Sequence, residues 1–297
     1  MSEHVELLTK VANLSMLIFM VSNMLAFGMR LSLAEILDPL REIKPTLKAL
    51  LGNFVIVPAA AYALIRVFHL EPGYAIGLLL VATSGGDPAT TKGSQLAKGN
   101  PAYTVAMMVA LQMMTVLLMP IILPPLLPGV HVDPLKIAKP LVLFLLAPLA
   151  LGLLIHARWS GVAARLWKPL DQFSSLAFLV VVSLFIGLNF RIAIGTVGSF
   201  AMLTSGMLVA VAFFAGYFLG APGQIRKSDL AIQTSFRGIS GAAAVAITNF
   251  PTQPKVLVMV LITLMLSLPV LVLVAPTVLR RKNVAVTAGK NITTTGK

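Results

Sequence analysis

Long runs of apolar residues, separated by short polar or basic stretches, repeat along the whole chain. About 20 apolar residues are enough for a helix to cross the hydrocarbon core of a bilayer. The pattern therefore predicts an all-α polytopic membrane protein with nine transmembrane helices. They are expected at residues 11–29, 49–65, 72–97, 101–127, 140–157, 172–190, 192–219, 230–249 and 256–279.

The third of these runs is interrupted near its middle by the stretch SGGDPATTKGSQLAKGN at residues 84–100. Glycines, a proline and both signs of charge stand where a simple span would be apolar. Backbone that is not helical survives at membrane depth only inside protein or beside a wet cavity. The breaking residues are Gly85, Gly86 and Pro88, and the charged ones are Asp87 and Lys92.

A second interruption lies in the eighth run, where Arg237, Gly238 and Gly241 follow only seven uncharged residues. Paired broken helices in the two halves of a chain are the best sequence indication of a transporter's binding site. We expect the two broken helices to cross near the middle of the bilayer. Their polar side chains would then face a shared aqueous pocket.

A faint internal repeat accompanies the two breaks. The first run ends LAFGMRLSL and the sixth ends LFIGLNFRI, which aligns Gly28 with Gly187. An odd number of spans between equivalent segments inverts the second copy, as in alternating-access carriers. The prediction is a first inverted four-helix repeat over 11–128, a connector helix with linkers over 129–168, and a second repeat over 169–280.

Composition and charge support the membrane assignment and orient the chain. Of 297 residues, 58% are hydrophobic and only 11% are charged, and mean hydropathy is +0.92. The net charge of +13 could suggest nucleic acid, but the basic residues are scattered over short loops. One predicted side carries fifteen lysines and arginines and the other six, so the positive-inside rule places the N-terminus outside. We expect a multi-pass protein of the cell (inner) membrane, with an extracellular segment 1–10, a disordered cytoplasmic tail 281–297 and no nucleic-acid partner.

Two cations within the predicted spans are candidates for substrate binding. Ionisable residues inside a membrane are costly and usually mark a transport path. Arg237 lies several turns from either end of its run, whereas Lys92 could instead extend to the membrane interface. An arginine fork and a lysine charge that face helix N-termini would suit a small organic anion.

Asp87 and several hydroxyl residues complete the candidate site. Asp87 is the only acidic residue predicted to lie outside the loops and the tail. It would either cap the half-helix that begins near Pro88 or act as a counter-ion that takes a proton. The hydroxyls would either bond to their own helices or add donors to a bound anion. They are Thr90, Thr91, Thr234 and Ser235.

Several motifs resemble those of the bile acid:sodium symporter family. They are FGMRLSL after the first run, GNFVIVPA in the second, GGDPATTKGSQLAKGN in the third and LAIQTSFRGISGAAAVAITNF in the eighth. The resemblance covers roughly residues 13–280. It implies a core domain, in which two broken helices cross beside the substrate path, and a panel domain, here expected to contain spans one, two, five and six.

The resemblance also implies sites for a coupling ion, and this chain departs from them. Sodium-coupled members place Ser-Asn where Thr90 and Thr91 stand, and a Glu near Thr234 followed by Gln-Asn near Arg237 and Gly238. No acid remains in the second break, and a nearby guanidinium repels sodium. The altered positions predict weak sodium coupling, with the charge of Lys92 and Arg237 in place of the ion. The remaining candidates for ion coupling, beside Asp87, are Asn53, Thr104 and Gln233.

These observations predict a secondary active transporter for an organic anion, which works by alternating access with Na⁺ or H⁺ as a possible coupling ion. The alternative is an anion channel or a non-transporting sensor on the same scaffold. An enzyme is not expected, because the histidines lie at loops or span ends and no nucleotide-binding or nucleophile motif is present. No cofactor is predicted, the lipid bilayer is an obligatory partner, and the sequence leaves the oligomeric state open.

Overall fold

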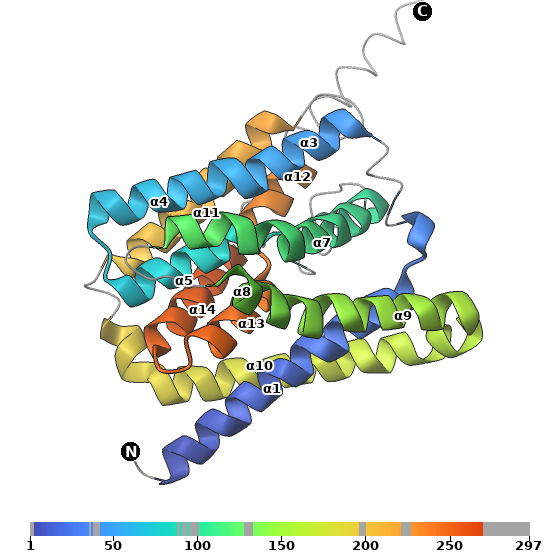
Figure 1. The fold of residues 1–297 in the computed structure, drawn as a ribbon, viewed down its shortest axis with the longest axis horizontal. Helices are drawn as coiled ribbons and strands as arrows, with labels where there is room; N and C mark the ends of the chain where they lie inside the picture. Colours follow the sequence, from blue (N-terminus) through green and yellow to red (C-terminus); the bar gives the residue numbers. More distant parts are fainter. Residues whose placement is uncertain are drawn as a thin grey trace, which may run out of the picture.

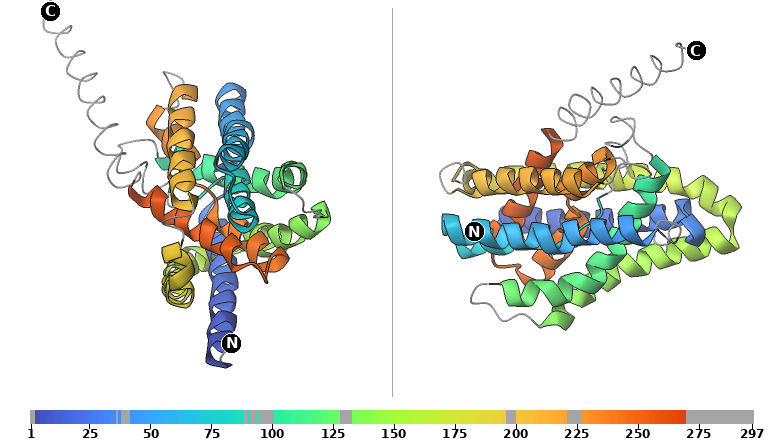
Figure 2. Two further views of the ribbon diagram at one scale, coloured as in Figure 1. Left: turned by 90° about the vertical axis from the view of Figure 1, so that its left-hand side faces the viewer. Right: turned by 90° about the horizontal axis from the view of Figure 1, so that it is seen from above.

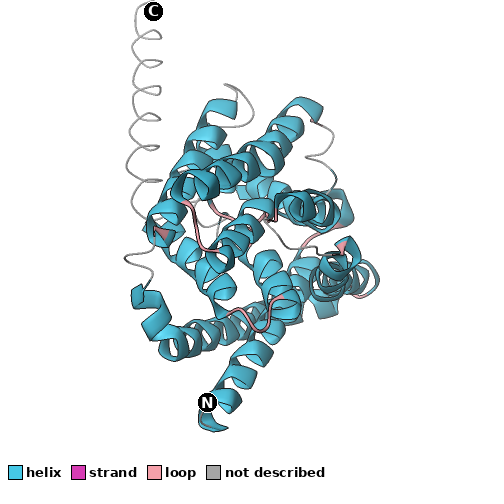
Figure 3. Ribbon diagram, turned by 60° about the vertical axis from the view of Figure 1, so that its left-hand side comes forward, coloured by secondary structure: helices cyan, strands magenta, loops and turns pink. Residues whose placement is uncertain are grey.

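The part of the chain that the computed structural model describes is built from helices and connecting loops, without a strand (Figures 1 and 3). It comprises residues 3–35, 37, 42–87, 90, 94, 101–127, 133–195, 200–220 and 227–269. Pro88, Thr91 and Lys92 lie outside these residues, so the predictions made for them stay predictions. The all-helical membrane class predicted from the hydropathy pattern is confirmed at this level.

The helices follow one another with short connections. In order they are α1 (Glu3–Arg30), α3 (Ile43–Leu51), η1 (Gly52–Ile56), α4 (Val57–Phe68), α5 (Pro72–Thr83), α7 (Pro101–Leu126), α8 (Pro134–Leu141), η2 (Val142–Leu146), α9 (Ala147–Arg158), α10 (Ser160–Gly195), α11 (Ala201–Leu219), α12 (Lys227–Ser235), α13 (Ile239–Asn249) and α14 (Pro254–Pro269).

Six helical stretches of the described chain are long and apolar enough to cross a membrane. They are Lys10–Arg30, Ile43–Phe68, Tyr103–Leu126, Pro134–Arg158, Ala201–Leu219 and Asp229–Asn249. Two shorter apolar helices, Pro72–Thr83 and Pro254–Ser267, accompany them. Each of the nine predicted ranges overlaps a helix, but the count of nine spans stays a prediction.

Two of the long helices contain a π-helical turn, and a proline explains each one. η1 comes just before Pro58 and η2 just before Pro148, each the second residue of the following α-helix. Proline has no backbone N–H and cannot donate to the preceding turn. The surplus residue of a π turn shifts the register there, and such turns often mark functional sites.

The helices pack in two groups. α1 packs against α9 and α10, whereas α4 packs against α11 and α5 (Figures 1 and 2). The second span therefore belongs with the broken helices rather than with the first span, and its predicted place in the panel is wrong. Order along the chain did not determine which helices become neighbours.

α1 and α9 approach closely through small residues. A Cβ atom on Gly28 would lie 2.3 Å from the carbonyl oxygen of Leu149, and Gly152 faces Gly28 across the same contact. Gly187, aligned with Gly28 in the proposed repeat, has nothing within 4 Å of such an atom. The two glycines therefore occupy different environments.

The connector with its linkers, predicted over 129–168, ends earlier in the structure, because α10 begins at Ser160 and continues through Pro169 as a single helix of 36 residues. Its basic residues therefore lie on a helix rather than in a loop. Exposed positions on its first turns, such as Arg165, give those charges access to water.

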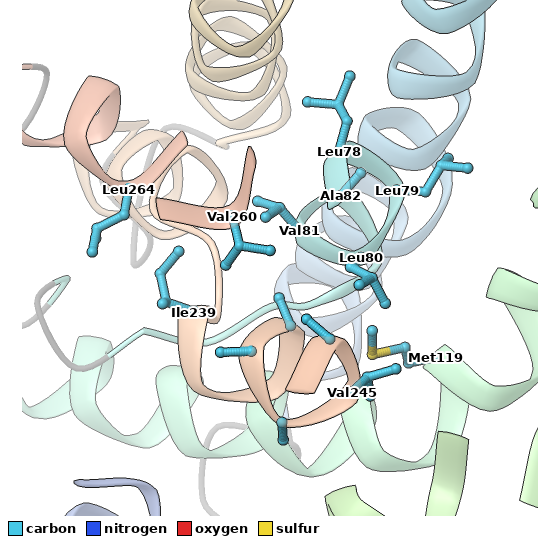
Figure 4. Packing of buried hydrophobic residues seen from close by; sticks show 14 of the residues in the cluster. Leu78, Leu79, Leu80, Val81, Ala82, Met119, Ile239, Val245, Val260 and Leu264 are labelled. Atoms are coloured by element: carbon cyan, nitrogen blue, oxygen red, sulfur yellow. The ribbon is translucent and has the colours of Figure 1, made fainter. Parts of the chain in front are cut away.

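The second broken segment lies at the centre of the molecule. In the most apolar window of Asp229–Asn249, 94% of the residues are buried, against 33% for Pro134–Arg158. Ile239 and Val245 of α13 pack among Leu80 and Val81 of α5 and Val260 of α14 (Figure 4). A broken helix surrounded by protein on all sides meets the condition for irregular backbone at membrane depth.

Candidate functional site

The two predicted breaks meet in the structure. α5 ends at Thr83 and the chain continues in extended form at Ser84, while α12 and α13 are separated by Phe236–Gly238. The backbone N–H of Gly238 donates to the carbonyl of Ser84 at 3.1 Å, and the Ser84 hydroxyl donates to the carbonyl of Gly238 at 2.5 Å. The N–H of Gly238 and the carbonyl of Ser84 lie outside the helices and thus satisfy each other, while the Gly238 carbonyl, which also accepts from the N–H of Ala242, gains the Ser84 hydroxyl as a second donor.

Glycines are needed where the breaks touch. A Cβ atom on Gly238 would lie 2.6 Å from the carbonyl oxygen of Gly85, and one on Gly241 would lie 2.7 Å from Ser84 Oγ. Gly86 has φ +78°, and its added Cβ would lie 2.4 Å from the carbonyl oxygen of Met108. Of the five residues predicted as breaks, Gly85, Gly238 and Gly241 therefore lie where the two breaks meet, and Gly86 lies against α7.

α7 supports the crossing with two polar side chains. Thr115 Oγ1 accepts from the backbone N–H of Gly85 at 2.8 Å, and it lies 3.1 Å from the carbonyl oxygen of Gly85. Gln112 donates to the hydroxyl of Ser240 at 3.3 Å, so it links α7 to α13. Thr115 was not among the predicted site residues, because a single threonine in an apolar helix does not indicate which residues it contacts.

Arg237 lies inside the crossing with only 2% of its surface exposed. Its Nε donates to the carbonyl of Val81 (3.2 Å), Nη1 to Asn53 Oδ1 (2.5 Å) and to the carbonyl of Thr234 (3.3 Å). Nη2 donates to the carbonyls of Asn53 (3.0 Å) and Ala82 (2.6 Å). A guanidinium has five N–H donors, and these bonds use all five. We call the five acceptors the oxygen cage.

The carbonyls of the oxygen cage are available for identifiable reasons. Ala82 lies in the last turn of α5 and Thr234 in the last turn of α12, where carbonyls have no helical donor. The Val81 carbonyl, also in the last turn of α5, accepts from the N–H of Ser84 as well, at 3.1 Å. Val57 donates to the carbonyl of Gly52 in the π register, so the matching donor for Asn53 would be Pro58, which has no N–H. The negative ends of two helix dipoles therefore face the guanidinium.

This geometry changes the expectation for Arg237. The prediction from the sequence is that the Arg237 fork faces helix N-termini and binds an anion. In the structure the guanidinium of Arg237 instead faces the C-terminal ends of α5 and α12. No N–H is left over for a substrate in the described conformation. The guanidinium of Arg237 is therefore bound by the oxygen cage, and its positive charge can act on a substrate only through space, without a direct hydrogen bond.

The predicted hydroxyl ligands of the described chain bond to their own helices. Thr90 donates to the carbonyl of Asp87 (2.6 Å), Thr234 to that of Leu230 (2.8 Å) and Ser235 to that of Ile232 (3.1 Å). This is the local alternative for such residues. Thr234 Oγ1 also lies 3.5 Å from Asn53 Nδ2, which places it beside the oxygen cage.

The candidates for ion coupling occupy three places. Asn53 belongs to the oxygen cage, whereas Gln233 donates to the backbone carbonyl of Thr104 at 2.7 Å and so joins α12 to α7. Asp87 is buried at the first break, and its carbonyl accepts from the backbone N–H of Thr90 at 3.1 Å. Within the residues that the structure describes, no group of three His, Asp or Glu side chains could hold a metal ion.

A second buried acid was missed by the sequence reading. Asp229 is fully buried and accepts from the hydroxyl of Ser94 at 2.7 Å. The expectation that Asp87 alone lies inside is therefore wrong. Asp229 stands one residue before the predicted start of the eighth span, and that boundary was set too late along the chain.

An open cavity of about 610 Å³ lies where α8 and η2 meet the end of α13. It combines two cations with apolar surface and two polar side chains. Its lining residues are Lys136, Lys139, Pro140, Leu143, Phe144, Thr248, Asn249 and Pro251. Asn249 also donates to the carbonyl of Lys136 at 3.2 Å, which joins the two walls.

Apolar helices around a buried crossing of two interrupted helices define a polytopic membrane protein. Residues 17–196 match the sodium bile acid symporter family, and the chain belongs to this family. It is a family of transporters, not of enzymes, and its name gives sodium as a coupled ion. The match ends before α12 and α13, so it does not include the second break.

Curated relatives agree with this assignment. A chloroplastic "probable sodium/metabolite cotransporter" of Oryza sativa subsp. japonica is 29% identical over 197 residues, which cover 66% of this chain and 48% of the relative. The "hepatic sodium/bile acid cotransporter" of Rattus norvegicus is 22% identical over 258 residues, covering 82% and 70%. The chain thus spans about half the length of the rice relative.

Proposed function

We propose that this chain is a secondary active transporter for an organic anion and that it works by alternating access. The crossing of two interrupted helices, joined directly between Ser84 and Gly238, carries the proposal. Broken helices that meet in the protein interior form the binding centre of many secondary transporters. The names of the relatives, which specify cotransport of metabolites and of a bile acid, support a small organic substrate.

The proposed architecture has nine transmembrane helices in two inverted repeats, over 11–128 and 169–280, joined by the connector 129–168. The panel would contain α1, the connector helix α8–η2–α9, and α10. The core would contain the remaining helices with both breaks. The N-terminal segment 1–10 would lie outside and the tail 281–297 in the cytoplasm.

The proposed substrate is an amphipathic anion, and the open cavity supports this class. Lys136 and Lys139 would attract a carboxylate, sulfonate or phosphate, while Leu143 and Phe144 would contact its apolar part. The cavity lies between the connector helix and α13, so it spans the proposed panel and core. Its volume of about 610 Å³ is in the range of small-molecule sites.

In this proposal Lys92 and Arg237 contribute positive charge near the path, and Lys92 is the one proposed to reach the substrate. Thr90, Thr91, Thr234 and Ser235 are proposed to line that region. Asp87 and Asp229 are the acids through which a proton could couple to transport, because each is buried at an interrupted helix.

The test is uptake of radiolabelled organic anions by proteoliposomes that contain the purified full chain. Candidate anions are first selected by thermal-shift screening, with and without sodium and at two pH values. We expect saturable uptake that Lys92→Ala and Arg237→Ala abolish, although both variants insert. Unchanged uptake in both variants would remove these residues from the mechanism.

A further inference from the structure

We propose that the oxygen cage is a cation site that Arg237 fills permanently, so that the crossing needs no sodium ion. In this account Arg237→Ala turns the cage into a sodium site. The consequence for coupling rests on the proposed transport function. The occupancy of the oxygen cage by Arg237 does not depend on the proposed transport function.

The ligand set is the first argument. The five acceptors are four backbone carbonyls and one amide oxygen, at 2.5–3.3 Å from the guanidinium nitrogens. Backbone carbonyls that replace a hydration shell are the ligands of alkali cations in ion-selective sites. Unwound carbonyls and half-helix C-terminal ends coordinate coupling ions in secondary transporters. The chemistry around Arg237 is that of a cation site.

The neutral composition of the cage is the second argument. Arg237 has no carboxylate among its five acceptors. A buried charge is stabilised only by paired or converging polar groups, and here the last turns of α5 and α12 supply the negative ends of two dipoles. These oxygens surround the guanidinium on its three nitrogens and would repel one another without a cation.

The covalent tether is the third argument. The guanidinium belongs to the segment between α12 and α13 and therefore cannot leave the site, unlike a free ion. It also bonds to η1 through Asn53 and to α5 through Val81 and Ala82. Arg237 thus holds three segments of the proposed core together without an ion from solution.

The experiment measures thermal unfolding of the purified full chain in NaCl, KCl and choline chloride at equal ionic strength, without substrate. The variants are Arg237→Ala, Arg237→Gln and, as a matched control, the exposed Arg165→Ala. We expect no sodium-specific shift in the wild-type protein or in Arg165→Ala. Arg237→Ala should melt earlier in choline and recover by about 2–4 °C in NaCl but not in KCl.

Binding of ²²Na⁺ gives a second readout, with specific binding expected for Arg237→Ala and Arg237→Gln but not for the wild-type protein. A sodium-specific stabilisation of the wild-type protein would overturn the proposal, and this arm needs no variant to fold. Sodium-insensitive unfolding of a folded Arg237→Ala or Arg237→Gln protein would overturn it as well. Because neither readout uses a substrate, failure here is distinct from failure of anion uptake.

Discussion

Ser84 and Gly238 are 154 residues apart in sequence, and each bonds to the other's backbone carbonyl. The Gly238 amide donates at 3.1 Å and the Ser84 hydroxyl at 2.5 Å. Both residues lie where a helix is interrupted, so the bonds join the two breaks. With Arg237 bonded across the same junction, α5, α12 and α13 are expected to move as one body against the panel.

Adding a methyl group at the junction is expected to separate the breaks. Gly238→Ala places a Cβ 2.6 Å from the Gly85 carbonyl oxygen, and this backbone atom cannot move aside without a loss of stability. We expect a loss of stability of about 1–3 kcal/mol, measured as an earlier thermal unfolding transition. Gly206→Ala is the matched control, because nothing lies within 4 Å of its added Cβ. Equal melting temperatures for both variants would contradict the junction's close packing.

The Thr115 hydroxyl is expected to stabilise the first break. Thr115→Val keeps the shape of the side chain but leaves the buried N–H of Gly85 without its acceptor. An unsatisfied buried donor costs about 1–3 kcal/mol. Thr204→Val serves as the control, since its hydroxyl bonds only to Phe200 and Ala201 of its own helix end. The prediction fails if Thr204→Val unfolds as early as Thr115→Val.

Neutralising the open cavity is expected to weaken anion binding without stopping transport. Lys136→Gln and Lys139→Gln should each raise the KM for uptake about two- to fivefold, because exposed ion pairs contribute less than about 1 kcal/mol. Lys168→Gln on α10 tests for a general effect of charge. KM values that do not change in either cavity variant would exclude the cavity from the substrate path.

The orientation can be tested directly because the chain contains no cysteine. Leu135→Cys and Trp159→Cys introduce single thiols at positions that are 75% and 57% exposed, near opposite ends of the connector helix. A membrane-impermeant maleimide should label Leu135→Cys in intact cells and Trp159→Cys only after permeabilisation. The reverse pattern would invert the proposed topology.

The sequence was sufficient to locate the two breaks and to predict that they meet. Glycine, proline and charge in an otherwise apolar run indicate irregular backbone, which at membrane depth must be surrounded by protein or face a wet cavity. It was not sufficient for the surroundings of Arg237. Which end of each half-helix faces the guanidinium depends on three-dimensional packing, so N-terminal and C-terminal ends could not be distinguished.

Other misses have similar physical causes. Asp229 was predicted to lie in a loop because helix boundaries are uncertain by a few residues. Its burial adds a second carboxylate, in addition to Asp87, to the interrupted helices. The place of the second span among the core helices depends on which apolar faces pack together. Pro58 was visible in the sequence, but its effect on the carbonyl of Asn53 follows only from the π register of η1.

Counterflow in sodium-free proteoliposomes is the most direct test of the account as a whole. Vesicles loaded with an unlabelled organic anion and diluted into a trace of the same labelled anion, with choline as the cation, should accumulate label transiently and with saturable kinetics. Such accumulation requires a site that faces the two sides in turn. Large anion currents without counterflow, or counterflow that appears only when sodium is added, would contradict the carrier with a built-in cation.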